Sequence, residues 1–323
     1  MIRLTSRHRW VRAIGWIAAG PLLVLVVGSG CAAGRGRAFA SPQEGANALV
    51  GALRPLDTEK LRAILGPDSE EIVSSGDEVA DRNAAAEFVD LYERHHNIIM
   101  GDGTATLVVG EDAWPMPIPL MRTGKSWHFD TEAGKEEILA RRIGRNELFA
   151  IEACRAIVDA QREFATLNSG GAGREPVYAQ KFASDPGQHN GLYWEAKEGE
   201  PESPLGPKIV EAVAEGYTAQ RAPAQGPRPF HGYCYRMLTA QGPAAAGGAR
   251  SYLVNGRMTG GFGVVAWPIE YGNSGIMTFI VSNQGVVYQK DLGKKTEPLA
   301  TEMSAFDPDP GWEIVPASSS PPQ

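Results

Sequence analysis

The pattern of apolar and polar positions after residue 40 predicts a group of helices. Ser41 is a typical N-cap, Pro42 suits a first helical turn, and Glu44 lies three residues after Ser41, as in a capping box. A helix is therefore expected to begin at Ser41. Apolar residues at helical spacing predict two further helices, over residues 57–65 and 80–96.

The pattern then changes to short runs that are typical of β-strands. These runs are separated by glycine-containing turns and cover residues 104–109, 114–121 and 126–129. Prolines alternate along the second run, which suits an edge strand because a proline nitrogen cannot donate to a neighbouring strand. Helices followed by a bent antiparallel sheet predict an N-terminal α+β domain over residues 41–135. The order of its elements is similar to that of the cone-like nuclear-transport-factor-2 fold.

A second α+β domain is predicted over residues 136–315. The charged residues 131–146 are expected to connect the two domains, and an apolar stripe predicts a long helix over residues 147–167. The next stretch is expected to be rich in loops, with short helical pieces near residues 178–182 and 207–214. Alternating apolar residues then predict four strands, which cover residues 230–238, 261–267, 276–282 and 285–290. The expected architecture is a long helix packed on an antiparallel sheet, followed by a disordered tail at residues 316–323.

Residues 1–40 have the pattern of an export signal. Four arginines and no acid lie in the first 12 residues, and an uncharged, mostly apolar stretch follows. The segment Gly28 to Cys31 resembles a bacterial lipobox, which implies cleavage before Cys31 and lipidation of its thiol. The alternative is ordinary cleavage after Ala40 in the A-x-A signal at residues 38–40, and a third interpretation keeps the segment as an uncleaved membrane anchor. We favour lipidation at Cys31, so that the protein is periplasmic or envelope-anchored and contacts the membrane only through its N-terminus.

Composition and charge restrict the function further. The chain has 323 residues, 43% of them apolar and 21% charged, as in folded globular proteins. Removal of residues 1–30, which hold four arginines and no acid, changes the net charge from −7 to −11. Such an acidic protein has no basic face for nucleic acid. Cys154 and Cys234 are the cysteines of the folded part, and the sequence leaves open a disulfide between them or two buried free thiols.

Motifs of known catalytic and metal sites are not matched. The Gly-Lys-Ser run at residues 124–126 is similar to the end of a phosphate-binding loop, but Pro119 stands where that loop needs a glycine. Asp307 begins an acidic stretch that lacks the glycine of a calcium loop. His95 and His96 are adjacent and would point about 100 degrees apart on a helix, too far for one metal ion. We therefore expect no cofactor, no metal and no catalytic residue.

Aromatic residues are the candidate pocket or contact residues. Those in the N-terminal domain are Phe88, Tyr92, Trp114 and Trp127, and a further pair is Tyr193 and Trp194. The first four could line a pocket if the cone-like domain is open, but a role in its core is favoured because aromatic side chains dominate small cores. The pair Tyr193 and Trp194 could instead form a surface patch that binds an envelope protein partner.

Several long strings of residues make the chain recognisable. They are RRIGRNELFAIEACRAIVDAQREFA, NGLYW, SPLGP, PFHGYCYRMLTAQG, GFGVVAWPIEYGNSGIMTFIVSNQGVVYQKDLG and FDPDPGW. They occur in the order found in the bacterial domain of unknown function 2950 family, which the chain resembles over nearly all residues after Phe39. This resemblance implies an exported envelope protein to which no reaction is assigned. The helix, loops and strands of the C-terminal half also resemble the globular head of type IV pilin-like proteins.

Two functions are compatible with these features. The first is an exported, non-enzymatic binding or structural module of the bacterial envelope, which we favour. The alternative is a small-ligand binder or hydrolase that uses a pocket in the N-terminal cone-like domain. The oligomeric state does not follow from the sequence.

Overall fold

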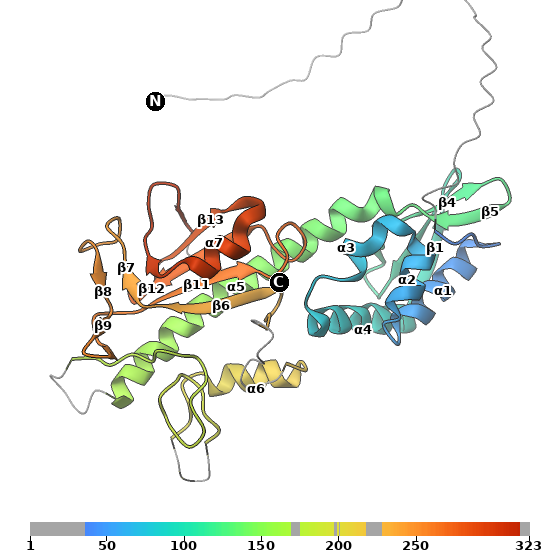
Figure 1. The fold of residues 1–323 in the computed structure, drawn as a ribbon. Helices are drawn as coiled ribbons and strands as arrows, with labels where there is room; N and C mark the ends of the chain where they lie inside the picture. Colours follow the sequence, from blue (N-terminus) through green and yellow to red (C-terminus); the bar gives the residue numbers. More distant parts are fainter. Residues whose placement is uncertain (1–35, 169–174, 197–198, 200, 218–227, 317–323) are drawn as a thin grey trace, which may run out of the picture. The chain divides into compact units, whose positions relative to one another are not determined.

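The computed structural model describes residues 36–168, 175–196, 199, 201–217 and 228–316 (Figure 1). Residues 1–35 of the predicted signal segment, which include Cys31, lie outside the described residues, and so does the predicted tail from residue 317 onward. Within the described ranges, no helix combines the length and the apolar character that a membrane span requires. The fold class is α+β, as predicted.

The N-terminal helices begin at side-chain caps. Their bounds are α1 Pro42–Leu53, α2 Thr58–Leu65, α3 Glu70–Val73, which follows a 3-10 turn at Pro67–Ser69, and α4 Glu78–Arg94. The Ser41 hydroxyl accepts from the Glu44 amide at 3.2 Å, which confirms the predicted start of α1. Asp57 and Asp77 cap α2 and α4 in the same way.

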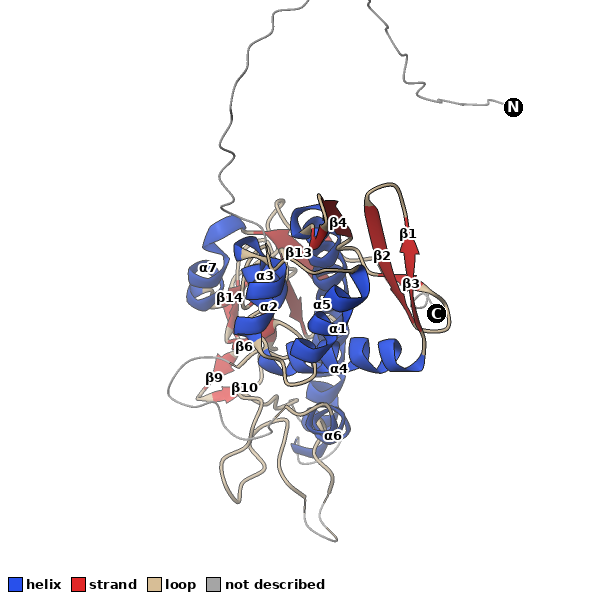
Figure 2. Ribbon diagram, turned by 90° about the vertical axis from the view of Figure 1, so that its right-hand side faces the viewer, coloured by secondary structure: helices blue, strands red, loops and turns tan. Residues whose placement is uncertain are grey.

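A five-stranded antiparallel sheet follows these helices. Its strands are β1 His96–Met100, β2 Thr104–Val109, β3 Trp114–Pro115, β4 Leu120–Thr123 and β5 Ser126–Phe129. The order is β1-β2-β4-β5, and β3 pairs with β2. Figure 2 shows β1 and β2 as a long hairpin. The predicted helix to residue 96 is wrong in its last turn, because His96 already pairs with Val109. The predicted strand 114–121 is broken in two, since its prolines cannot extend the ladder.

The longest element is α5, Thr131–Asn168, a single helix of 38 residues. The expectation that residues 131–146 form a connector is therefore wrong. Within this charged stretch, Arg141 pairs with Glu137 one turn away at 2.5 Å, which adds a small contribution to the stability of the helix. Gly134 lies so close to the backbone of Pro117 that a side chain would not fit there. The boundary expected at residues 135–136 falls inside this helix, and the described residues group as one compact unit.

The C-terminal half is built on a second antiparallel sheet. Its strands, in spatial order, are β15 Glu313–Ile314, β13 Val287–Asp291, β12 Met277–Ser282, β11 Gly263–Pro268 and β6 Tyr233–Leu238. The helix α5 packs on one face of this sheet, and α7 Thr296–Glu302 packs on the other. The alternation along the strands explains this arrangement, because Val264 and Ala266 face α5 whereas Val265 and Trp267 lie in the cluster with α7.

Smaller elements complete the structure. They are the 3-10 turn Gly293–Lys295, the helix α6 Gly206–Ala214, the strands β7 Ala240–Gln241, β8 Arg250–Ser251 and β14 Ala305–Phe306 of a small sheet, and the paired strands β9 Leu253–Val254 and β10 Arg257–Met258. The predicted helical piece at residues 207–214 is confirmed as α6. The helical piece predicted at residues 178–182 is wrong, because Tyr178 forms a single β-bridge with Met258 and residues 180–182 form a bend.

The two cysteines of the described chain are free thiols. Cys154 points from α5 into the core on one face of the sheet, and Cys234 on β6 belongs to the core on the other face. The sheet lies between these two side chains, so the geometry does not support a disulfide. Burial raises the pKa of each thiol to about 12, which keeps both protonated at neutral pH.

Candidate functional site

A cavity of about 840 Å³ lies between α5 and α6. The wall formed by α5 consists of small and aliphatic side chains, Ala153, Ala156 and Ile157. The opposite wall is α6, which contributes Ile209 and Ala212 among others. Small side chains on both helices leave room between them, because a well-packed pair of helices would fill this space with larger residues.

Five aromatic rings also line the cavity. They are Phe182, Tyr193, Tyr217, Phe230 and Tyr235. All five are only partly buried, in contrast to Tyr233 and Phe279 in the neighbouring core, which are fully buried. The rings come from separate segments of the chain, so the fold brings them together around one space. This arrangement is typical of a ligand pocket rather than of a closed core.

One of the lining residues carries a polar group that has no partner among the described residues. The hydroxyl of Tyr235 is buried and forms no hydrogen bond with any described residue. Burial raises the pKa of this phenol well above its ordinary value, so the group is a neutral donor at physiological pH. A buried hydroxyl that lacks a partner costs about 1–3 kcal/mol. This hydroxyl is closed off from the cavity, so Tyr235 lines the cavity with other atoms of its side chain.

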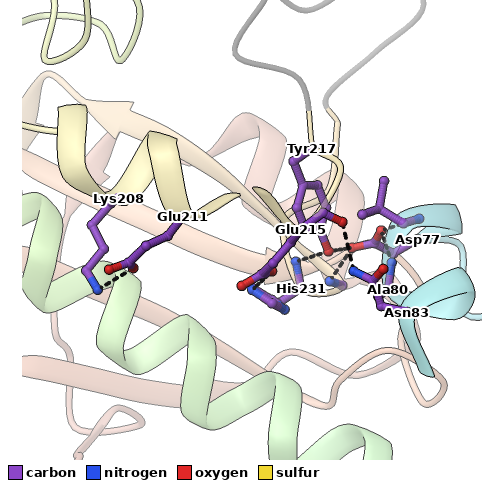
Figure 3. Close-up of polar contacts among 10 residues, drawn as sticks. Asp77, Ala80, Asn83, Lys208, Glu211, Glu215, Tyr217 and His231 are labelled. Carbon is purple, nitrogen blue, oxygen red and sulfur yellow. Dashed lines mark hydrogen bonds and ion pairs between the residues drawn. The ribbon is translucent and has the colours of Figure 1, made fainter. Parts of the chain in front are cut away.

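Asp77 holds one end of the cavity together (Figure 3). Its side chain is buried, with 1% of the residue exposed. One carboxylate oxygen caps α4 by accepting from the amides of Val79 and Ala80, at 3.2 and 3.1 Å. The other oxygen accepts from the Gly232 amide at 2.8 Å and from the Tyr217 hydroxyl at 2.9 Å. One carboxylate therefore joins α4 to the segment after α6 and to the turn before β6.

The turn at His231 and Gly232 is the second part of this joint. Both residues have positive φ angles, 48° and 75°, and Phe230 and Tyr233 close the turn through two backbone hydrogen bonds. This is a two-residue hairpin turn of the type that needs left-handed conformations at both central positions. Histidine adopts this conformation less readily than glycine, so its side chain is expected to compensate for the backbone cost.

The imidazole of His231 does form such compensating contacts. It lies 3.0 Å from the Glu215 carboxylate and stacks on Phe149, with 4.0 Å between ring centroids. Burial lowers the pKa of His231, and the nearby Glu215 only partly opposes this effect. The backbone amide of His231 donates to the Tyr217 hydroxyl at 3.1 Å.

These contacts fix the end of α6. Glu215 and Tyr217 follow directly after α6, and the carbonyl of Glu215 accepts from Asn83 on α4 at 2.9 Å (Figure 3). The pKa of Tyr217 is raised by burial and by the Asp77 charge, so its hydroxyl remains a donor. We conclude that the joint around Asp77 positions one wall of the cavity.

A second joint attaches the middle of α5 to the loop at residues 270–277. Asn146 donates to the carbonyl of Ser274 at 2.9 Å. Glu147 accepts from the amides of Ile276 and Met277, each at 3.0 Å. These side chains bond to backbone groups, so they hold the loop in place directly before β12. Ser274 is buried within this joint, and its hydroxyl bonds with the backbone of Glu270.

Arg142 strengthens the same region. Its guanidinium donates to the carbonyls of Glu71 and Ile72, at 2.5 and 2.6 Å, and also to the Asn273 side chain. Burial lowers the pKa of this arginine. The guanidinium thus links α3, α5 and the loop that carries Asn273.

The predicted aromatic residues of the N-terminal domain belong to its core and its surface. Tyr92 and Trp127 are buried in the hydrophobic cluster between helices and sheet, and Phe88 packs against it. Trp114 is 36% exposed and lies edge-on to Phe88, with Arg141 above its ring. None of these four residues lines the cavity beside α6 or the smaller polar hollow of about 310 Å³ next to β4 and β5.

The predicted pair at residues 193 and 194 divides between two environments. Tyr193 lines the cavity, as described above. Trp194 is 7% exposed and belongs to the core; its indole donates to the Pro201 carbonyl at 3.1 Å and stacks on His189. Of the six aromatic residues singled out in the sequence, Tyr193 is therefore the one that lies at this site.

The described histidines and acids offer no site for a metal ion. Within the described residues, no group of three or more His, Cys, Asp or Glu side chains is placed to hold a metal ion. Asp309 pairs with Lys290 at 3.1 Å, and Asp307 accepts from the amide of Ala244 at 2.8 Å. These acids attach residues 307–309 to neighbouring segments of the chain.

Comparison with known proteins assigns the family. The family model described as "Protein of unknown function (DUF2950)" matches residues 36–315. The chain belongs to the DUF2950 family. No curated protein and no solved structure matches this chain.

The recognised strings of this DUF2950 protein coincide with its two joints. The run that contains Asn146 and Glu147 bonds with the loop that contains the GNSGI string, and the PFHGYCY string contains the turn at His231. Asp77, the centre of the first joint, was not predicted from the sequence. Its signal was a local one, an Asp followed by Glu at the start of a helix, and it does not differ from an ordinary N-cap.

Proposed function

We propose that this DUF2950 protein is an exported binding protein of the bacterial envelope, and that it takes up a small, mostly apolar ligand in the cavity beside α6. The observation that carries the proposal is the cavity itself. A volume of about 840 Å³ lies within the range of ligand sites, roughly 300–1,000 Å³. Partly buried rings and small aliphatic side chains around one space are also typical of such sites.

The polar groups at the cavity favour binding over a reaction. Asp77 accepts four hydrogen bonds from the protein, and His231 contacts both Glu215 and Phe149. Asp77 lines the cavity and His231 lies beside it, and both are engaged in holding the structure, so neither is free to exchange protons with a ligand. The proposed role is therefore to hold a molecule rather than to transform it.

The position of Phe39 supports anchoring by lipid over ordinary release. Phe39 is 2% exposed and forms a two-bond β-bridge with Trp127, with N–O distances of 2.7 and 2.8 Å. Arg37 also donates from its backbone to Ala63 at 2.9 Å. Cleavage after Ala40 would remove both residues from the fold. Cleavage before Cys31 would keep them, and it would leave the acylated residue a few positions ahead of the folded part.

Ligand uptake is tested with the fluorescent probe 1-anilinonaphthalene-8-sulfonate and the folded protein. Ala156→Phe fills the cavity from α5, and Ala140→Phe is the matched control on an exposed position of the same helix. We expect the wild type and the control to bind the probe with the same affinity, and the cavity-filling variant to lose at least ten-fold in affinity. Equal binding by all three proteins would refute the proposal.

Anchoring is tested by cell fractionation with metabolic lipid labelling. The wild type should carry the label and sediment with membranes, whereas Cys31→Ala should lose both properties. Label that persists in Cys31→Ala would exclude lipidation at this residue.

A further inference from the structure

We propose that the ligand of this cavity is an anionic amphiphile with a single alkyl chain, such as a fatty acid, and that Lys181 and Lys208 bind its head group. This inference rests on the proposed function, because it concerns the ligand of the same site. It adds the chemical class of the ligand and the residues that recognise its charge.

Charged side chains of opposite sign lie at opposite ends of α6. The described lining residues include three cations, Lys181, Lys208 and Arg228, and two acids, Asp77 and Glu78. Lys208 is in the first turn of α6, whereas Asp77 lies beyond the last turn of this helix (Figure 3). The helix has 9 residues and is therefore about 13 Å long. An anionic group next to Lys208 is thus well separated from the two acids.

Backbone hydrogen bonds place Lys181 at the same end of the cavity as Lys208. The carbonyl of Lys181 accepts from the amide of Leu192 at 3.2 Å, and the carbonyl of Leu192 accepts from the amide of Leu205 at 3.0 Å. Leu205 is the residue directly before α6, and Lys208 follows three residues later. The fold therefore brings two lysines from separate segments to the start of α6.

Both lysines are paired with acids, but these pairs leave room for a ligand. Lys208 lies 2.8 Å from Glu211, and both side chains are 62% exposed. Lys181 pairs with Asp185, and their side chains are 37% and 33% exposed. Ion pairs with this exposure contribute little to stability, and each ammonium group has three N–H donors. One acid per lysine therefore does not prevent the same ammonium from donating to the oxygen of a ligand.

The walls between the two ends are mainly apolar. Apart from the five rings, the lining contains aliphatic side chains from α4, α5 and α6 and from the residue before α6, namely Val79, Ala153, Ala156, Ile157, Leu205, Ile209, Ala212 and Val213. Burial of apolar surface has no directional requirement, so an alkyl chain can follow such a mixed lining. Each buried CH2 group is expected to increase the affinity roughly four-fold. A charged head at one end of an apolar channel is the pattern that an amphiphile requires.

The inference is tested by isothermal titration calorimetry of the folded protein below the critical micelle concentration of each compound. Decanoate, 1-decanol and decyltrimethylammonium share one chain and differ in the charge of the head group, and hexanoate has the anionic head with a shorter chain. We expect decanoate to bind roughly five-fold or more tightly than 1-decanol, as contacts of the strength of exposed ion pairs imply. Decyltrimethylammonium and hexanoate should both bind more weakly than decanoate.

A lysophosphatidylglycerol with a decanoyl chain distinguishes the two sources of such an amphiphile. Its negative charge is on a phosphate, so tighter binding of this compound would identify a membrane lipid as the source. Tighter binding of decanoate would identify a free fatty acid. Either result supports the proposed chemistry, whereas binding of neither compound by a protein that binds 1-decanol would overturn it.

The decisive variant replaces both lysines by methionine, which keeps an unbranched side chain and removes the charge. Lys181→Met combined with Lys208→Met should lose the preference for decanoate over 1-decanol and keep the affinity for 1-decanol. Lys294→Met is the matched control, since Lys294 is an exposed lysine outside the cavity lining. It should bind decanoate like the wild type.

Glu211→Gln gives a test in the opposite direction. This substitution removes the acid that pairs with Lys208, so the affinity for decanoate should rise roughly two- to five-fold. A preference for decanoate that persists without both lysines would overturn the inference. Equal affinities for decanoate and 1-decanol in the wild type, or tighter binding of decyltrimethylammonium, would overturn it as well.

The failure of the inference and that of the proposed function give different results. Alkyl compounds that bind without any preference for the anionic head would refute the inference alone. Failure of every compound and of 1-anilinonaphthalene-8-sulfonate to bind would refute both.

Discussion

Replacement of Asp77 by asparagine is the most direct test of the joint that positions α6. Asp77 is an acceptor on both oxygens, and its four partners are the amides of Val79, Ala80 and Gly232 and the hydroxyl of Tyr217. Asparagine has nearly the same size but offers one oxygen and one NH2 group. Whichever way its amide is oriented, the NH2 group faces two donors, so one half of the joint must break.

The expected cost follows from these contacts. If the side-chain oxygen of the asparagine keeps the bonds that cap α4, the buried Gly232 amide loses its acceptor. This loss lowers the free energy of unfolding by about 1–3 kcal/mol. Loss of the hydrogen bond from Tyr217 to the charged carboxylate lowers the free energy of unfolding by a further amount of about 1.5–3 kcal/mol. Relaxation of the turn will recover part of this sum. We therefore expect Asp77→Asn to lower the free energy of unfolding by about 3 kcal/mol.

The assay is urea unfolding followed by tryptophan fluorescence, with Tyr217→Phe as the comparison. That variant removes one donor to Asp77 and one acceptor for the His231 amide, so its loss should be smaller, about 1.5 kcal/mol. The double variant should lose less than the sum of the single variants, because both remove the same bond. A loss below 1 kcal/mol in Asp77→Asn would refute the view that this carboxylate holds the joint.

Three further predictions concern other parts of the fold. Because burial lowers the pKa of His231, the unfolded chain binds the proton more strongly, and the free energy of unfolding should fall as the pH drops below about 6.5. The variant His231→Asn tolerates the left-handed turn, and it should reduce this pH dependence of stability in thermal unfolding. Cys154 and Cys234 should resist iodoacetamide at pH 8 in the folded protein and should both react in urea without reductant, as read by mass spectrometry. Glu147→Ala should cost about 2–3 kcal/mol in urea unfolding, whereas Glu147→Gln, which keeps an acceptor oxygen, should cost less than about 1 kcal/mol.

Each of these predictions has a result that would contradict it. An unchanged pH profile in His231→Asn would place the titrating group elsewhere. Rapid alkylation of the folded protein would mean that the thiols are accessible, and protection that disappears only with reductant would indicate a disulfide. Equal losses in Glu147→Ala and Glu147→Gln would show that the carboxylate charge, and not its position as an acceptor, stabilises the loop.

The sequence predicted best those elements that local rules determine. The start of α1 at Ser41, the strand Ser126–Phe129 and the four main strands of the C-terminal sheet were located within a few residues, because capping and alternation are local signals. The errors arose where tertiary contacts decide. Residues 131–146 look like a solvated connector, yet they are helical because Gly134 packs on Pro117 and Arg142 bonds to α3.

Most of the candidate site could not be predicted from the sequence. Its cavity depends on the distance between α5 and α6, and spacing along the chain does not contain that distance. Tyr193 was predicted as a contact residue because it is one of two adjacent aromatic residues. Tyr235 lies in the alternating pattern of an ordinary strand, which gives no sign of a role at a site. Its lack of a partner becomes evident only in the folded arrangement.

The continuity of α5 has a consequence for changes in its length. Arg142 bonds to α3, and Asn146 bonds to the loop before β12, one turn further along the same helix. One inserted residue between them would rotate the two halves by about 100 degrees and separate them by about 1.5 Å. The two bonding partners could then no longer be reached together. The number of residues in this helix thus fixes the distance and the rotation between the contacts that it makes in the two hydrophobic cores. Deletions or insertions here should therefore be far more harmful than substitutions on its solvent face.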